Sequence, residues 1–247
     1  MRESRLSFRL ATNHDVKAIY SWLLEHDRRG VHGSFLCNWN LTQRVHDDHQ
    51  LVVAALEDEP VAYIWEDFGI LEVREDFRKK GVGKQLVEYA MQRAIIRGRI
   101  AVFIECKPES SIPFWKKMGF EFHNKNEASF VFEKSLDIPT DGLPVNVEIM
   151  FYPEKAKWTP EISPIKSYYP TAVLDNQGTI HLQNRVAAYI DGENHNGDAM
   201  IKICVDGKPV YFNKAKYSEA KAIGITYKSG TFYIDKVYNK ALHRTNR

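Results

Sequence analysis

A proline- and glycine-containing segment just past the middle of the chain separates two stretches with different hydrophobic patterns. Asp137–Pro144 holds two prolines and one glycine, residues that interrupt helices and strands. Helical and strand periodicities alternate before this segment, whereas short strand patterns separated by turn residues follow it. At 247 residues the chain is long enough for two ordinary domains. We therefore predict a domain over residues 1–136, a linker over 137–144 and a second domain over 145–247.

The first stretch predicts a mixed α/β domain. Strands are expected at 7–10, 51–56, 61–65, 68–73, 100–106, 120–123 and 128–133. Helices are expected after a cap at Asn13 or Asp15, over residues 82–95, and after a cap at Ser110 or Ser111. Residues 28–50 are polar and are expected to form a loop with one short helix. The second stretch predicts a small β-rich domain, a sandwich or a barrel. Its strands are expected at 145–151, 172–174, 179–182, 187–190, 199–205, 209–212 and 230–237, with one helix at 217–223.

The turn that leads from the predicted strand 68–73 into the predicted helix 82–95 has the composition of a phosphate-binding site. Gly81 and Gly83 let backbone N–H groups approach a ligand, and a helix N-terminus favours an anion. Positive charge is added by Arg78, Lys79, Lys80 and Lys84. The two glycines are too close together for a P-loop, and Leu86 stands where a dinucleotide fingerprint needs its third glycine.

Two signatures at the expected distance from each other carry a family resemblance. Arg78-Lys79-Lys80-Gly81-Val82-Gly83 resembles the acetyl-CoA motif R/Q-x-x-G-x-G/A of the GNAT acetyltransferases, with Phe77 and Val73 in the positions that precede it. Phe114–Phe120 resembles the C-terminal F/L-Y-x-K-x-G-F signature of that family. The resemblance covers about residues 1–136. It implies a mixed central sheet flanked by helices and an N-acetyltransferase that uses acetyl-CoA.

The same resemblance implies the position of the cofactor. The backbone of Leu71 and Val73 would pair with the pantetheine arm like an added strand. The amides from Arg78 through Lys84, which include Lys79, Lys80, Gly81, Val82 and Gly83, would hold the pyrophosphate. Trp115 is expected to contribute to cofactor binding. The acceptor would be a primary amine on a small molecule, a peptide or protein, or an aminoacyl-tRNA, and no metal is expected.

The sequence leaves alternatives for the general acid and the general base. Trp115 occupies the place of the usual catalytic tyrosine, and an indole N–H cannot give up a proton near neutral pH. Asp67 lies six residues before Val73, where some family members carry a catalytic Glu, and it shares side-chain parity with Leu71 and Val73 in a regular strand. Glu66 and Glu72 point the other way in that register. Glu105 is the second candidate for the base, and a water relay without a dedicated base is the third possibility.

The composition of the chain gives only weak indications of its partners and its location in the cell. The chain has 34 Lys and Arg against 32 Asp and Glu, so it lacks the basic excess of a typical nucleic-acid binder. Its three cysteines form no disulfide framework, which favours a cytoplasmic protein, and no membrane partner is expected. Lysines and tyrosines interleave in the second domain, a pattern that can bind single-stranded nucleic acid, but half-buried tyrosines with lysines outside them are the favoured interpretation. A non-catalytic GNAT fold that senses acyl-CoA is the alternative function. The sequence does not determine the oligomeric state, and a homodimer is one of the alternatives.

Overall fold

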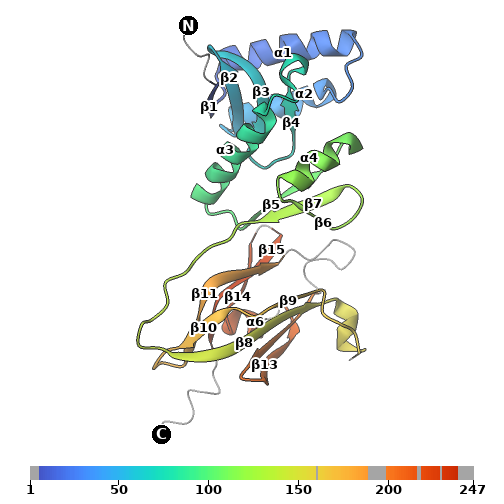
Figure 1. Cartoon of the computed structure of the whole chain (residues 1–247). Helices are drawn as coiled ribbons and strands as arrows, with labels where there is room; N and C mark the ends of the chain where they lie inside the picture. The colour runs from blue at the N-terminus through green and yellow to red at the C-terminus, as the bar shows by residue number, and fades with distance from the viewer. Residues whose placement is uncertain (1–5, 160, 189–198, 216–217, 229, 239–247) are drawn as a thin grey trace. The chain divides into compact units, whose positions relative to one another are not determined.

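The structure is a computed structural model, and it describes residues 6–159, 161–188, 199–215, 218–228 and 230–238. The chain divides into two compact units, Met1–Phe130 and Val131–Arg247 (Figure 1). The predicted boundary at residue 136 therefore lies six residues beyond this division. Backbone pairing explains the difference, because Arg185 N–H donates to Lys134 O and Leu136 N–H donates to Gln183 O, both at 2.8 Å. These bonds attach residues 134–136 to a strand of the second unit.

The first unit contains two sheets. An antiparallel sheet has the order β1-β2-β3-β4, formed by Leu6–Leu10, Leu51–Leu56, Glu59–Trp65 and Leu71–Val73. A smaller sheet has the order β5-β7-β6, formed by Ala101–Glu105, Glu127–Val131 and Glu121–Phe122. β4 is thus an edge strand of the first sheet and β5 an edge strand of the second. This arrangement leaves an unpaired edge of β4 next to the elements that follow it in the chain.

Helices cover both faces of the larger sheet. On one face, α1 (Asn13–Arg28) and α2 (Trp39–Asp47) pack through Ile19, Leu23 and Trp39 against Val53 and Tyr63. On the other face, α3 (Val82–Ile96) contacts β2, β3 and β4. The remaining helical elements of this unit are η1 (Leu36–Asn38), η2 (Glu75–Phe77), η3 (Glu109–Ser111) and α4 (Ile112–Lys117). The mixed sheet flanked by helices that the family resemblance implied is confirmed.

Two local predictions in this unit are wrong, and the cap predicted for α4 is right in position but forms no side-chain hydrogen bond. Thr12, not Asn13 or Asp15, caps α1, because its hydroxyl accepts from Asp15 N–H while the Asp15 carboxylate accepts from Thr12 N–H. No side chain caps α4, although Ser111 stands at its N-cap. The strand predicted from residue 68 begins only at Leu71, because Phe68 has a φ of 69° and Gly69 N–H donates to Asp67 Oδ1 in a tight turn.

The second unit is built from strands. Their order is β13-β12-β8-β10-β11-β15-β14, with β9 paired to β8. Their bounds are Leu143–Tyr152 (β8), Lys166–Tyr168 (β9), Thr171–Leu174 (β10), Thr179–Ala188 (β11), Met200–Val205 (β12), Lys208–Lys214 (β13), Ile225–Lys228 (β14) and Thr231–Tyr238 (β15). The unit also contains η4 (Glu154–Lys157) and α6 (Ser218–Ala222). The predictions at 179–182 and 187–190 describe one strand, β11, although residues 189 and 190 lie outside the described part. β9 and β14 were not predicted.

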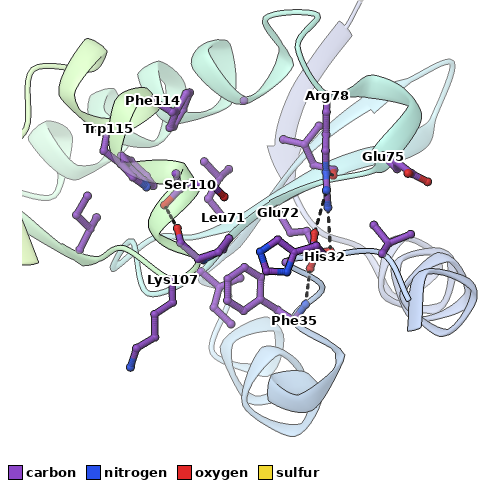
Figure 2. A pocket seen from close by; sticks show the side chains of 18 of the residues that line it. His32, Phe35, Leu71, Glu72, Glu75, Arg78, Lys107, Ser110, Phe114 and Trp115 are labelled. Carbon is purple, nitrogen blue, oxygen red and sulfur yellow. Dashed lines mark hydrogen bonds and ion pairs between the residues drawn. The ribbon is translucent and has the colours of Figure 1, made fainter. Parts of the chain in front are cut away.

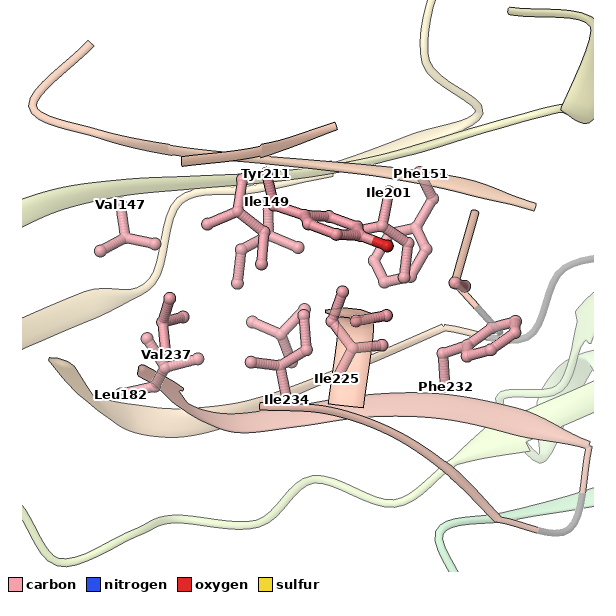
Figure 3. Packing of buried hydrophobic residues seen from close by; sticks show 14 of the residues in the cluster. Val147, Ile149, Phe151, Leu182, Ile201, Tyr211, Ile225, Phe232, Ile234 and Val237 are labelled. Atoms are coloured by element: carbon pink, nitrogen blue, oxygen red, sulfur yellow. The ribbon is translucent and has the colours of Figure 1, made fainter. Parts of the chain in front are cut away.

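The sheet of the second unit curves around one hydrophobic core. Figure 3 shows Val147, Ile149 and Ile201 of β8 and β12 facing Leu182 and Ile234 of β11 and β15. The path of paired strands ends at β13 on one side and at β14 on the other, and α6 contacts both of these strands. The unit is therefore a half-open barrel, which confirms the predicted β-rich barrel-like architecture.

Candidate functional site

The free edge of β4 presents the backbone groups of alternate residues. Trp65 N–H donates to Ile70 O and Arg74 N–H donates to Val61 O, both at 2.9 Å, while Glu72 lies opposite Tyr63. In an antiparallel ladder, the backbone N–H and C=O groups of every second residue point toward the neighbouring strand, and those of the residues between them point away from it. The N–H and C=O groups of Leu71 and Val73 therefore point away from β3, toward the free edge. This is the orientation that an added pantetheine strand would require.

A cleft of about 1180 Å³ lies beside this edge. Its walls come from β4, the turn into α3, the end of β5, α4 and the segment between α1 and α2 (Figure 2). Nine of the predicted site residues line it: Leu71, Val73, Arg78, Lys79, Gly81, Gly83, Lys84, Glu105 and Trp115. Lys80, Val82 and Asp67 are not among its lining residues. Val82 is buried, and Lys80 is exposed with its Nζ 5.3 Å from the centre of the Phe77 ring.

The two glycines of the turn have different structural roles. Gly81 is the N-cap of α3 with a φ of 81°, and no side chain caps this helix. A Cβ at Gly81 would meet only Gln85 Nε2, at 3.9 Å, so the space in front of the first turn is open. A Cβ at Gly83 would approach Val73 Cγ2 to 3.3 Å, so this glycine allows α3 to pack closely on β4. The unsatisfied N–H groups of the first turn suit an anion.

The side chain of Arg78 is held by two backbone carbonyl groups. Its Nε donates to Val73 O at 2.9 Å, and its Nη1 donates to His32 O at 3.1 Å. The guanidinium therefore ties the end of β4 to the segment between α1 and α2. The side chains of Lys79 and Lys84 are both exposed at the cleft, and Lys84 Nζ lies 3.7 Å from Glu88 Oε1.

The most unusual side chain in the cleft wall is Glu72, at the centre of β4 and only 2% exposed. Its Oε2 accepts hydrogen bonds from Phe35 N–H at 3.0 Å and from Tyr63 Oη at 3.2 Å. Its Oε1 is buried and has no hydrogen-bond partner among the residues that the structure describes. Two groups that can carry a positive charge lie near this Oε1, His26 Nδ1 at 3.8 Å and Arg78 Nη2 at 4.0 Å, and Figure 2 shows Glu72 between Arg78 and Phe35.

Burial has a large effect on the acidity of Glu72. It raises the pKa of this carboxyl to about 7, although the Phe35 N–H, the Tyr63 hydroxyl and Arg78 oppose the rise. Burial also raises the pKa of Tyr63 well above its ordinary value, so that hydroxyl stays protonated and keeps donating to Glu72. A carboxyl with a pKa about 7 gains and loses a proton readily at neutral pH, which is the property of a general base.

The two carboxylates singled out from sequence lie in different surroundings. Asp67 is exposed in the turn before β4, so the strand parity on which its prediction depends is absent. Glu105 lines the cleft at the end of β5, but it is 55% exposed and forms an ion pair with Lys107 at 2.5 Å. Glu66 is buried on the other side, where it pairs with Arg93 of α3 and with Arg97, the residue that follows this helix. Glu72 was set aside in the sequence analysis because its side chain lies on the opposite face of the strand from Leu71 and Val73, the face assigned to Asp67. A single acid within the apolar run of β4 was the signal that would have found it.

Trp115 lies in the cleft wall as part of the aromatic packing. Its side chain is buried against Phe114 and Phe120, with ring centroids 5.0 and 4.9 Å away. We expect Trp115→Phe to lower kcat/KM by less than about tenfold, because the loss is one of packing rather than of a proton donor. Steady-state kinetics with saturating CoA thioester measure this effect. A loss of several orders of magnitude with unchanged CoA affinity would assign Trp115 a chemical role.

Two further observations concern what the described residues contain. They hold no group of three or more His, Cys, Asp or Glu side chains placed to bind a metal ion. Among their helices, none is both long enough and apolar enough to cross a membrane.

The sequence of one part of the chain matches a known protein family. Residues 47–122, which include β2 to β4, the glycine turn and α4, match the family described as "Acetyltransferase (GNAT) domain". This part of the chain is therefore a domain of the GNAT acetyltransferase family, and the resemblance predicted from the two signatures is confirmed.

Individual proteins are also similar to this part of the chain. An uncharacterised N-acetyltransferase of Methanocaldococcus jannaschii is 29% identical over 115 residues, which are 41% of this chain and 43% of that protein. The chain thus matches less than half the length of this curated relative. A GNAT acetyltransferase from Brucella melitensis in complex with acetyl-CoA has a TM-score of 0.42 at 14% identity, and covers 56% of this chain and 93% of its own. The PaiA N-acetyltransferase of Thermoplasma acidophilum in complex with coenzyme A has a TM-score of 0.43 at 12% identity, and covers 52% and 99%.

Proposed function

We propose that the protein is an N-acetyltransferase that transfers an acetyl group from acetyl-CoA to a primary amine on a small molecule, a peptide or protein, or an aminoacyl-tRNA. The observation that carries this proposal is the position of Glu72. It is a buried carboxyl with one unpartnered oxygen, in the wall of a cleft whose other end is an uncapped helix N-terminus. A base and an anion site in one cleft are the two features that this reaction needs.

The residues of the cleft fit the cofactor. The first-turn amides of α3 would hold the pyrophosphate, with Lys79 and Lys84 adding charge and Gly81 leaving room for close approach. The backbone groups of Leu71 and the N–H group of Val73 would pair with the pantetheine arm, whereas Val73 O already accepts a hydrogen bond from Arg78 Nε. Acetyl-CoA would supply the activated acetyl group as a thioester.

Glu72 would act as the base of the reaction. As the amine nitrogen forms a bond to the thioester carbon, Glu72 Oε1 would accept the amine proton, directly or through one water. The carbon–sulfur bond breaks, and the leaving thiolate takes a proton from solvent. A thiol has an ordinary pKa of about 8.5, so this leaving group needs little help near neutral pH. None of the described residues that line the cleft is a tyrosine, which agrees with protonation of the thiolate by solvent rather than by a side chain.

Asp67 and Glu105 remain testable alternatives to Glu72. Asp67 would need the turn before β4 to rearrange, since its carboxylate accepts from Gly69 N–H there. Glu105 faces the cleft but is exposed and paired with Lys107, so it lacks the dry surroundings that make Glu72 basic. The Glu105→Gln variant is therefore a matched control for Glu72→Gln, because both replace a cleft-lining Glu by its amide.

A panel of amines tests the proposal. Purified protein is incubated with acetyl-CoA and each amine, CoA thiol release is measured, and the acetylated product is identified by mass spectrometry. We expect at least one amine to be acetylated by the wild-type protein and by Glu105→Gln, but only weakly by Glu72→Gln. Binding of acetyl-CoA without turnover of any amine class would favour the non-catalytic acyl-CoA sensor instead.

A further inference from the structure

We propose that His26 is a positioning residue that orients Glu72 Oε1 and stabilises the ionised form of Glu72 through its Nδ1–H group. This inference rests on the proposed function, because it assigns a second residue to the base of that reaction. No sequence pattern selects His26, which lies in the last turn of α1, 46 positions before Glu72.

The position of the proton on His26 follows from its other nitrogen. Nε2 lies 3.5 Å from the backbone nitrogen of Glu75, a group that can only donate, so Nε2 accepts this long bond. A neutral imidazole then carries its proton on Nδ1. Nδ1 is buried without a hydrogen-bond partner in the described part of the chain, and so is Glu72 Oε1, 3.8 Å away. A relative movement of roughly 1 Å would join these two atoms in a hydrogen bond of ordinary length.

The two oxygens of Glu72 would then have different roles. Oε2 is held by Phe35 N–H and the Tyr63 hydroxyl, which fix the plane of the carboxylate. Oε1 would be held by His26 and would still have a lone pair free for the amine or a bridging water. Buried polar atoms nearly always have partners, and these two unpartnered atoms, 3.8 Å apart, are complementary to each other as donor and acceptor.

The surroundings keep His26 neutral. Burial, Arg78 and Arg29 lower the pKa of His26, whereas Glu75 and Asp76 act in the opposite direction. Glu72 is faced by His26 from α1, by Tyr63 from β3 and by Arg78 from the turn after β4. A neutral donor at this place favours the carboxylate over the carboxylic acid without cancelling its basicity.

Three substitutions of His26 test the role of the Nδ1 donor. His26→Asn keeps an amide N–H at the level of Nδ1, His26→Gln moves it to the level of Nε2, and His26→Leu removes it. We expect the titration midpoint of Glu72 to rise by about one pH unit in His26→Leu and His26→Gln, because a hydrogen bond to a charged group is lost. In His26→Asn the midpoint should stay within a few tenths of the wild-type value.

The midpoint is measured in two ways on the full chain. NMR titration of protein carrying ¹³C-labelled glutamate follows Glu72 directly, with the resonance assigned by its loss in Glu72→Gln. The acidic limb of the kcat/KM profile follows it during turnover. Equal midpoints in Asn, Gln and wild-type proteins would overturn the proposal, and so would a rise in His26→Asn as large as in His26→Gln. Because the NMR titration requires no activity, a failure of the proposed reaction would be recognised separately from a failure of this pairing. If His26→Leu does not fold, the Asn and Gln pair decides.

Discussion

Replacement of Glu72 by Gln is expected to lower kcat/KM at neutral pH by about 10²–10⁴, the usual contribution of a general base. The amide has the same shape, and its oxygen can still accept from Phe35 N–H and the Tyr63 hydroxyl. It cannot accept a proton from the amine. Initial rates with the best acceptor, together with CoA affinity from calorimetry, measure the effect. We expect the affinity for CoA to change little, because the backbone groups of Glu72 pair with β3 and its side chain is not part of the glycine turn.

The same comparison distinguishes the three carboxylates. Glu105→Gln and Asp67→Asn should each lower kcat/KM by less than about tenfold, since neither side chain is buried at the cleft. If Glu105→Gln were the inactive variant and Glu72→Gln were not, the base would be Glu105. If all three variants kept their activity, a water relay without a dedicated base would replace Glu72 in the mechanism.

Glu72→Gln should also stabilise the protein at alkaline pH. Burial raises the pKa of Glu72 from 4.5 to about 7, so ionisation of Glu72 opposes folding. This cost is absent below about pH 4.5, grows as the pH rises, and is complete above pH 7. It amounts to about 3 kcal/mol, because each pH unit between the unfolded and folded pKa values corresponds to about 1.4 kcal/mol. Denaturant unfolding at pH 8 should therefore show a higher free energy of unfolding for the variant, with a much smaller difference at pH 5. A variant less stable than the wild type at pH 8 would contradict the buried, high-pKa carboxyl.

Replacement of Gly81 by Glu is expected to weaken the binding of CoA by about 10²–10³-fold. The new carboxylate would lie a few ångströms from the pyrophosphate, and two unit charges about 4 Å apart near a protein surface repel by about 4 kcal/mol. The fold should survive, because a Cβ at this position meets only the end of Gln85, at 3.9 Å. Calorimetric titration with CoA measures the loss, and circular dichroism confirms the fold.

Gly81→Asn is the matched control for this experiment. Gly81 has a φ of 81°, a region that asparagine tolerates better than other residues with a side chain. The Asn variant therefore places a side chain at this left-handed position without a negative charge, and it should retain most of the CoA affinity. Equal losses in the Glu and Asn variants would mean that backbone strain, not charge, governs the site, and the phosphate position would have to be reconsidered.

The parts of the site that sequence predicted are those made by local backbone geometry. The glycine turn, the helix after it and the apolar strand before it are encoded within residues 71–96, so Gly81 and Gly83 could be given roles without a structure. The base could not be found in this way. Its identification depends on where a strand begins, and a turn at Phe68 with a positive φ removes the regular parity that favoured Asp67. His26 and Tyr63 meet Glu72 only through tertiary packing, which no short motif records.

The second unit was predicted less well for a related reason. Alternating apolar residues identify strands such as β8 and β12, but the length and pairing of a strand depend on its neighbours. Residues 183–185 separated two strands in the sequence-based prediction. In the structure β11 continues through them, because residues 134–136 pair with it there. The short strands β9 and β14 contain few apolar residues and owe their structure to pairing with β8 and β15.

The pH dependence of kcat/KM tests the role of this cleft in acetyl transfer most directly. Rates with the best amine should be expressed per concentration of unprotonated amine, so that ionisation of the acceptor does not contribute. We expect the wild-type protein to show an acidic limb with a midpoint near 7, the pKa of Glu72, and Glu72→Gln to lack this limb at its much lower rate. A wild-type profile that is flat through this range, or a limb with the same midpoint in Glu72→Gln, would contradict Glu72 as the base of the reaction.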